Sequence, residues 1–128
     1  LLNDLQKEVE KIFKEQWETR EGQVVPESED LKLSNDAVLL DGTVLYADLS
    51  GSTYLVDNYN QHFAAEIYKS FLHCAAKIIR DGGGYITAYD GDRIMAVFVG
   101  NSKNTSAAKA ALKIYFAVLD IINPAIKK

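Results

Sequence analysis

The sequence predicts an α+β fold in which helices pack on one small sheet, and three observations lead to this prediction. A short β-rich run occupies residues 43–47 and has turn residues on both sides. Apolar residues recur at spacings of three and four over residues 61–80, which indicates an amphipathic helix. Two more β-rich runs, residues 85–89 and 93–99, flank an Asp-Gly pair, which is a strong hairpin signal.

The first part of the chain, residues 1–36, is expected to be an amphipathic helix followed by a connection. Apolar residues at helical spacing extend from Leu2 to about Trp17, with Lys and Glu between them. Residues 18–36 are polar and contain a glycine and a proline, so we expect an irregular segment there. The main domain is then expected to fill residues 37–128.

A second long helix is expected after the hairpin that Asp90-Gly91 forms. Asn104 or Thr105 would cap this helix, and Pro124 would end it. The predicted order of strand, helix, two-stranded hairpin and helix matches the first five elements of the ferredoxin-like βαββαβ plan. The last strand of that plan is absent from this chain. Either residues outside the chain complete the sheet, or the domain is an unusual fragment.

The composition of the 128 residues predicts one globular domain and excludes several classes of protein. Apolar residues make up 48% and charged residues 25%, which is ordinary for a domain with a core. A net charge of -4 argues against a nucleic-acid-binding protein. Cys74 is the single cysteine, and the sequence contains neither a long apolar run nor a leader, so we expect a cytoplasmic protein without a membrane span. The chain begins at Leu1 and stops just after a helix, so we expect a piece of a longer protein.

Two aspartates stand at strand ends that the ferredoxin-like plan brings together. Asp48 closes the first strand and Asp92 opens the third, and these strands are antiparallel neighbours in the plan. We therefore expect both carboxylates at one edge of the sheet. Mg²⁺ is commonly held by one or two carboxylates together with substrate phosphates. The residues alone leave another interpretation open, in which Asp90 and Asp92 are turn residues and Asp48 caps the next segment.

A turn of small residues follows Asp48 and adds weight to a phosphate-binding interpretation. In the segment Leu49-Ser50-Gly51-Ser52-Thr53, no bulky side chain keeps a phosphate from the backbone amide groups. The turn lacks the lysine of a P-loop, and the P-loop pattern occurs nowhere in the chain. Ordinary NTPase chemistry is therefore not expected.

Residues 44–53 and 83–98, with the helix between them, resemble the class III nucleotidyl cyclases. The resemblance covers roughly residues 40–123 and implies a cyclase catalytic domain that is incomplete at its C-terminal end. It also implies a nucleoside triphosphate substrate and a head-to-tail homodimer whose active sites lie between two subunits.

The same resemblance implies catalysis by two divalent cations, Mg²⁺ or Mn²⁺. Asp48 and Asp92 would be the catalytic residues and would hold both ions, with the backbone carbonyl of Leu49 completing one coordination sphere. One ion would lower the pKa of the ribose 3′-hydroxyl for in-line attack on the α-phosphate. The other would neutralise the phosphates and the pyrophosphate leaving group. Backbone amides from Ser50 to Thr53 would cradle the phosphates.

The choice of base is where the sequence departs from purine cyclases of this family. Ala88 stands where those enzymes place a Lys or Glu that reads the base, and a short apolar side chain cannot read a purine edge. Tyr46 shares a strand face with Asp48, so its ring would shorten the base pocket. Arg93 is expected either to reach phosphates or the partner subunit, or to form a plain salt bridge.

These features make the chain look like a Pycsar-type pyrimidine cyclase. Such bacterial antiphage enzymes convert UTP or CTP to the 3′,5′-cyclic monophosphate, which activates a separate effector protein. A purine cyclase of class III and a catalytically silent cyclase-like regulatory module are the alternatives. A diguanylate cyclase is not expected, because the chain lacks a Gly-Gly-[Asp/Glu]-Glu-Phe hairpin.

Overall fold

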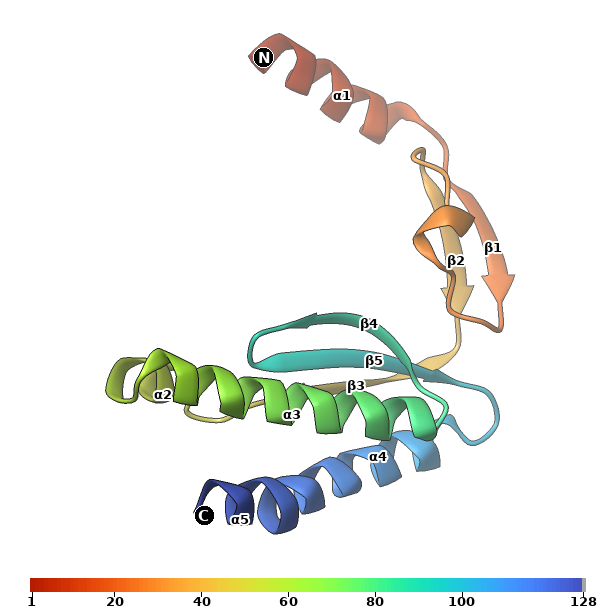
Figure 1. Cartoon of the computed structure of the whole chain (residues 1–128). Coiled ribbons are helices and arrows are strands. Elements are labelled where there is room, and N and C mark those ends of the chain that lie inside the picture. Colours follow the sequence, from red (N-terminus) through yellow and green to blue (C-terminus); the bar gives the residue numbers. More distant parts are fainter. Residues whose placement is uncertain (128) are drawn as a thin grey trace. The chain divides into compact units, whose positions relative to one another are not determined.

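A computed structural model describes residues 1–127, and contacts divide the chain into two units, residues 1–41 and 42–128 (Figure 1). The division falls after Asp41, five residues beyond the boundary expected from the sequence. Within the described residues, no helix combines the length and the apolar composition needed to cross a bilayer.

The first unit contains two strands, β1 and β2, that the sequence does not predict. Strand β1 pairs in parallel with strand β2, from Glu18 opposite Asp36 to Gly22 opposite Leu40. The expectation of an irregular connection over residues 18–36 is therefore wrong for β1. Its residues are polar and largely exposed, so no apolar alternation marks it, and backbone pairing alone makes it a strand. The elements of this unit are α1 (Leu2–Lys14), β1 (Glu18–Gly22), the 3₁₀ turn η1 (Ser28–Asp30) and β2 (Asp36–Leu40).

The second unit is built on a three-stranded antiparallel sheet in the order β3-β5-β4. The expected antiparallel pairing of the first and third strands of the plan is confirmed, because β3 pairs with β5 along its whole length. Strand β4 pairs with the other edge of β5 and carries an irregularity between Ile86 and Ala88. The three strands are β3 (Gly42–Asp48), β4 (Tyr85–Asp90) and β5 (Arg93–Val99).

Helices α3 and α4 cover one face of this sheet (Figure 1). Alternation along β3 directs Leu45 and Ala47 into the core beneath the helices and leaves Val44 and Tyr46 on the open face. The expected α+β fold is therefore confirmed. The helical elements are α2 (Ser52–Asn58), α3 (Gln61–Asp81), α4 (Lys103–Ala117), the π-helical turn η2 (Val118–Ile122) and α5 (Asn123–Ile126).

Both predicted ends of the second long helix are wrong. Ser102, rather than Asn104 or Thr105, occupies the N-cap of α4, and the Asn104 side chain instead accepts a hydrogen bond from the Thr43 hydroxyl. Pro124 lies in the first turn of α5 instead of ending the helix. A proline is tolerated there because the first amides of a helix have no acceptor within it.

The hairpin turn also differs from the prediction. Asp90 and Arg93 face each other as the last pair of the ladder, so the loop consists of Gly91 and Asp92. Neither loop residue has a positive φ. The expected turn at Asp90-Gly91 is therefore wrong by one residue, and Asp92 lies in the loop itself.

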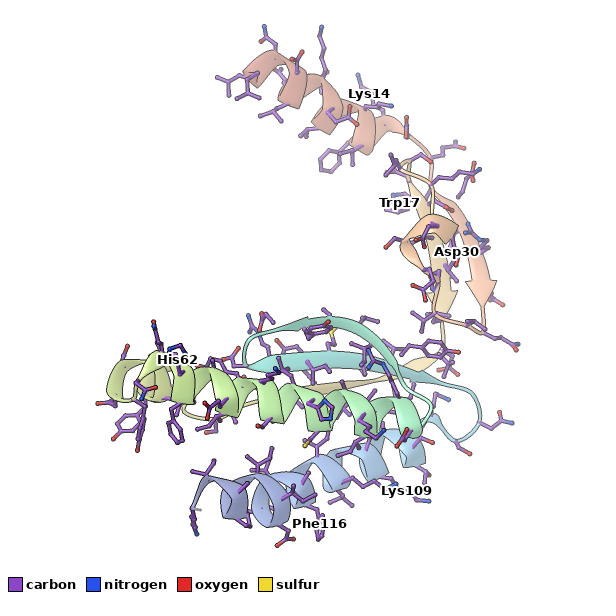
Figure 2. The ribbon with its side chains drawn as sticks, viewed as in Figure 1. Lys14, Trp17, Asp30, His62, Lys109 and Phe116 are labelled. Atoms are coloured by element: carbon purple, nitrogen blue, oxygen red, sulfur yellow. The ribbon has the colours of Figure 1, made fainter. Side chains whose placement is uncertain are left out.

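The core of the second unit lies between the sheet and the helices, around the fully buried side chains of Phe98, Ile79 and Ile94. As predicted, helix α3 ends at its glycines, and Gly83 has a φ of 85°. Gly84 comes next, and a Cβ at this position would lie 2.7 Å from the Phe98 ring. Only a glycine therefore allows the backbone to run this close to the core. Figure 2 shows Lys109 and Phe116 on the outer side of α4.

Candidate active site

The two predicted catalytic aspartates lie next to each other at one end of the sheet. Asp48 is the last residue of β3 and is paired in register with Arg93, the residue that follows Asp92. The chain beyond the strand stays close, because the Leu49 amide donates a 2.7 Å hydrogen bond to the Asp92 carbonyl oxygen. The antiparallel register therefore brings together two carboxylates that are 44 residues apart in the sequence.

Asp92 is held in its ionised form by a neighbour from the small-residue turn. The Ser52 hydroxyl donates a 2.7 Å hydrogen bond to Oδ2 of Asp92. This hydrogen bond lowers the pKa of Asp92, while partial burial acts in the opposite direction. Asp48 is exposed at the end of its strand.

The segment after Asp48 forms the turn that the sequence predicts and then begins a short helix. Gly51 has a φ of 75° and occupies the N-cap of α2, where its carbonyl accepts the Leu55 amide at 3.0 Å. A positive φ explains why a glycine stands there. Ser50 lies in the turn, and Ser52 and Thr53 open the helix, where amide groups have no acceptor within the helix.

The two residues expected to shape the base site, Tyr46 and Ala88, line one pocket together with Arg93. Tyr46, Ala88 and Arg93 surround a space of about 230 Å³ together with residues of the β4–β5 hairpin. Neither Asp48 nor Asp92 belongs to its lining. The remaining lining residues are Tyr89, Asp90, Ile94 and Met95.

Arg93 forms the plain salt bridge that was one of its two expected roles. Its Nε atom lies 3.1 Å from Oδ2 of Asp90 across the hairpin. This hydrogen bond raises the pKa of Arg93 above its ordinary value, and Tyr46 adds to the effect. Arg93 therefore adds a positive charge, paired with the Asp90 carboxylate, to the lining of the pocket.

The residues at the strand end fit a hard divalent cation together with a phosphate-bearing ligand. The side chains of Asp48 and Asp92 and the Leu49 carbonyl offer oxygen atoms only, which Mg²⁺ and Mn²⁺ prefer. No group of three or more His, Cys, Asp or Glu side chains suited to a metal occurs among residues 1–127. The site is thus one that needs ligand oxygens to complete a coordination sphere.

Tyr68 is a site residue that the sequence does not reveal. Its hydroxyl donates a 2.9 Å hydrogen bond to the Ser52 carbonyl oxygen. In the sequence Tyr68 stands among the apolar residues of the α3 face, so nothing distinguishes it from a packing residue. Met95 was also missed, although alternation from Arg93 along β5 places it on the same face.

Curated relatives match nearly the whole chain. A uridylate cyclase of Burkholderia cepacia is 59% identical over 100% of this chain and 57% of its own length. One of Xanthomonas perforans is 58% identical over 88% of this chain and 49% of its own length. One of Rhodovulum sp. (strain MB263) is 38% identical over 95% and 51%. The chain therefore spans about half the length of the relatives it matches, and no protein-family model matches it.

Two solved structures share the fold. A crystal structure of a guanylyl cyclase matches with a TM-score of 0.58 and 22% identity, over 62% of this chain and 42% of that one. A crystal structure of an adenylyl cyclase from P. aeruginosa matches with a TM-score of 0.58 and 22% identity, over 66% and 47%. The resemblance inferred from the two aspartate motifs is confirmed: the chain is homologous to uridylate cyclases and has the fold of a class III nucleotidyl cyclase catalytic domain.

Proposed function

We propose that the complete protein is a uridylate cyclase, which converts UTP to 3′,5′-cyclic UMP and pyrophosphate. The observation that carries this proposal is the β3–β5 register, which sets Asp48 beside the hairpin loop of Asp92. The relatives named uridylate cyclase support the reaction class and favour UTP over CTP as the substrate.

Asp48, Asp92 and the Leu49 carbonyl would hold two divalent cations, Mg²⁺ or Mn²⁺. When bound, such cations activate a hydroxyl nucleophile and neutralise the charge of a pyrophosphate leaving group. The chain itself would orient the triphosphate through backbone amides of Ser50 to Thr53. The Ser52 hydroxyl hydrogen bond, which lowers the pKa of Asp92, would orient its carboxylate toward a cation.

The pocket beside the aspartates supports a pyrimidine base. Tyr46 and Ala88 both line this pocket, where the Tyr46 ring would shorten the space for a base and the Ala88 side chain would offer no hydrogen bond to a purine edge. Arg93 lines this space while it is paired with Asp90, and its guanidinium would meet a carbonyl oxygen of the base or a phosphate.

A homodimer with the open face of the sheet inside the interface completes the proposal. Val44 and Tyr46 are 61% and 54% exposed on this face, which no helix of the second unit covers. Apolar sheet faces of this kind usually mark an interface. We place the enzyme in the cytoplasm and its product in bacterial antiphage defence, as a signal for a separate effector protein.

The direct test is to incubate the full-length protein with UTP, CTP, ATP and GTP in turn, with Mn²⁺, and to identify products by mass spectrometry. Cyclic UMP as the main product is expected. Preference for ATP or GTP would reject the pyrimidine site. Binding of nucleotide without turnover would instead favour a silent regulatory module.

Substitution of Asp48 tests the role of the strand end. Asp48→Ala is expected to abolish product formation without change in the circular dichroism spectrum, because the side chain is exposed and supports no packing. Asp81→Ala, at the exposed end of α3, is the matched control and should keep full activity. Activity that survives Asp48→Ala would contradict the metal scheme.

A further inference from the structure

Tyr68 contacts both loops that carry the aspartate site. From the middle of α3, its hydroxyl donates a 2.9 Å hydrogen bond to the Ser52 carbonyl oxygen in the first turn of α2. Its ring also lies beside the hairpin loop, since a Cβ on Gly91 would meet Cδ2 of Tyr68 at 3.6 Å. One half-buried side chain therefore touches both the first turn of α2 and the loop that contains Asp92.

Ser52 also joins the first turn of α2 to the hairpin loop that contains Asp92. Its carbonyl accepts from Tyr68, and its hydroxyl donates a 2.7 Å hydrogen bond to the Asp92 carboxylate. Ser52 thus connects Tyr68 of α3 to Asp92 through two hydrogen bonds, one at its carbonyl oxygen and one at its hydroxyl. A displacement of the Ser52 backbone would move the hydroxyl that orients the carboxylate.

The two helices differ in how firmly they are anchored. Helix α3 places Phe71, Ala75 and Ile79 in the core, whereas α2 has no buried residue. Apolar packing therefore fixes α3, whereas α2 adds no residue to the core and meets the start of α3 through the ring contact of Tyr59 with Phe63. The first turn of α2 depends on polar contacts such as the one from Tyr68.

We propose that Tyr68 is a positioning residue that transmits the rigidity of α3 through Ser52 to the Asp92 carboxylate, and so prepares Asp92 for a divalent cation. This inference rests on the proposed function, because it assigns a cation to Asp92. Hydrogen bonds to a ligating carboxylate typically change metal affinity by about tenfold or more when removed. Tyr68 acts one bond further away, so a smaller effect of about threefold to tenfold is expected.

The experiment compares four forms of the full-length protein, which are wild type, Tyr68→Phe, Ser52→Ala and the double variant. Tyr68→Phe keeps the ring against Gly91 and removes only the hydroxyl. Mn²⁺ binding is measured by electron paramagnetic resonance in the presence of a non-hydrolysable UTP analogue. Tyr115→Phe is the matched control, because Tyr115 is an exposed tyrosine of α4.

The expected result is a Mn²⁺ dissociation constant that rises about threefold to tenfold in Tyr68→Phe and about tenfold or more in Ser52→Ala. The effects should not add in the double variant, because both substitutions break one path. Additive effects, or a Tyr68→Phe value equal to that of Tyr115→Phe, would overturn the proposal. If Tyr68 had only a structural role, Tyr68→Phe would lower the thermal stability of the wild type and of the Ser52→Ala variant by the same amount.

Hydrogen exchange of the metal-free protein separates this inference from the proposed function. Tyr68→Phe should speed exchange of the amides in residues 49–55 by about threefold or more, whereas Tyr115→Phe should leave them unchanged. Unchanged exchange would refute the positioning role of Tyr68 even if the protein were an active cyclase. If the wild type made no cyclic nucleotide but exchange still increased in Tyr68→Phe, the proposed function would fail. The contact from Tyr68 to Ser52 would still hold the first turn of α2.

Discussion

The two units of the chain bury opposite kinds of side chain. Among the described residues of the second unit, 42–127, the buried side chains are apolar and lie between the sheet and its helices. In residues 1–41, all of which the structure describes, the only buried residues are Asn35 and Asp36. Leu2, Phe13 and Leu33 of this unit are each at least 80% exposed.

Polar contacts take the place of a core in the first unit. Asn35 Nδ2 donates to the carbonyl oxygens of Ile12 and Glu15 at 2.8 and 3.0 Å, and so ties the end of α1 to β2. Asp36 accepts the Lys32 amide at 2.9 Å and forms an ion pair with Arg20. Hydrogen bonds specify geometry but contribute little net stability. The comparison therefore predicts that the second unit loses most stability when its apolar core is truncated, while the first unit responds to the loss of single polar groups.

The largest expected effect is on the core of the second unit. Phe98→Ala removes a fully buried ring and should lower the free energy of unfolding by about 3–5 kcal/mol. Urea denaturation followed by circular dichroism measures this loss. Leu112→Ala, at a position of α4 that is 69% exposed, is the control and should cost less than about 1 kcal/mol. Equal costs would contradict the placement of the core.

A smaller effect is expected for the buried amide of the first unit. Asn35→Ala leaves two carbonyls at the end of α1 without their donor and should cost about 1–3 kcal/mol of local stability. Hydrogen exchange of residues 2–22 and 36–40 should report this loss, and residues 93–99 should be unaffected. If protection fell equally in β5, the two units would not be independent.

Acid should act on the first unit through Asp36. The hydrogen bond from the Lys32 amide and then the one from Arg20 lower the pKa of Asp36 below 3.8. A lowered pKa contributes stability that is fully present above about 3.8 and is lost as the pH falls through the folded-state value. Acid titration followed by hydrogen exchange of residues 18–22 tests this. Asp36→Asn should remove this titration step, and an unchanged acid midpoint in that variant would argue against it.

The smallest effect is expected for the exposed stripe of α1. Phe13→Ser should change stability by no more than about 0.5 kcal/mol, since Phe13 is 85% exposed and both residues have similar helix propensity. The free energy of unfolding of the full-length protein measures it. A loss above about 2 kcal/mol would mean that another part of the complete protein covers this face.

The second unit was largely predictable because its sequence patterns and its packing agree. The apolar spacing of residues 61–80 and the alternation in residues 93–99 each describe the face that meets the core. The plan that these elements imply then placed Asp48 beside Asp92, which the register of β3 and β5 confirms. Buried apolar surface leaves a periodic signal, so these features could be read from residue types.

The first unit was less predictable for the same reason. Strand β1 has no apolar alternation, and its pairing with β2 depends on backbone groups that every sequence possesses. Asn35 and Asp36 read as ordinary loop residues until their partners are known. The π-helical turn η2, which follows the end of α4 and leads into α5 with Pro124, also left no distinct pattern.

Sequence alone determined the α+β order of elements, the two aspartates and the small-residue turn between them, because each depends on local spacing and on residue chemistry. Only the tertiary structure decided that Asp92 lies in the hairpin loop, that Ser52 holds its carboxylate and that Tyr68 holds Ser52. These contacts join residues that are 16 and 40 positions apart. A hydroxyl on an apolar helix face carries no local sign of the carbonyl that it will meet after folding.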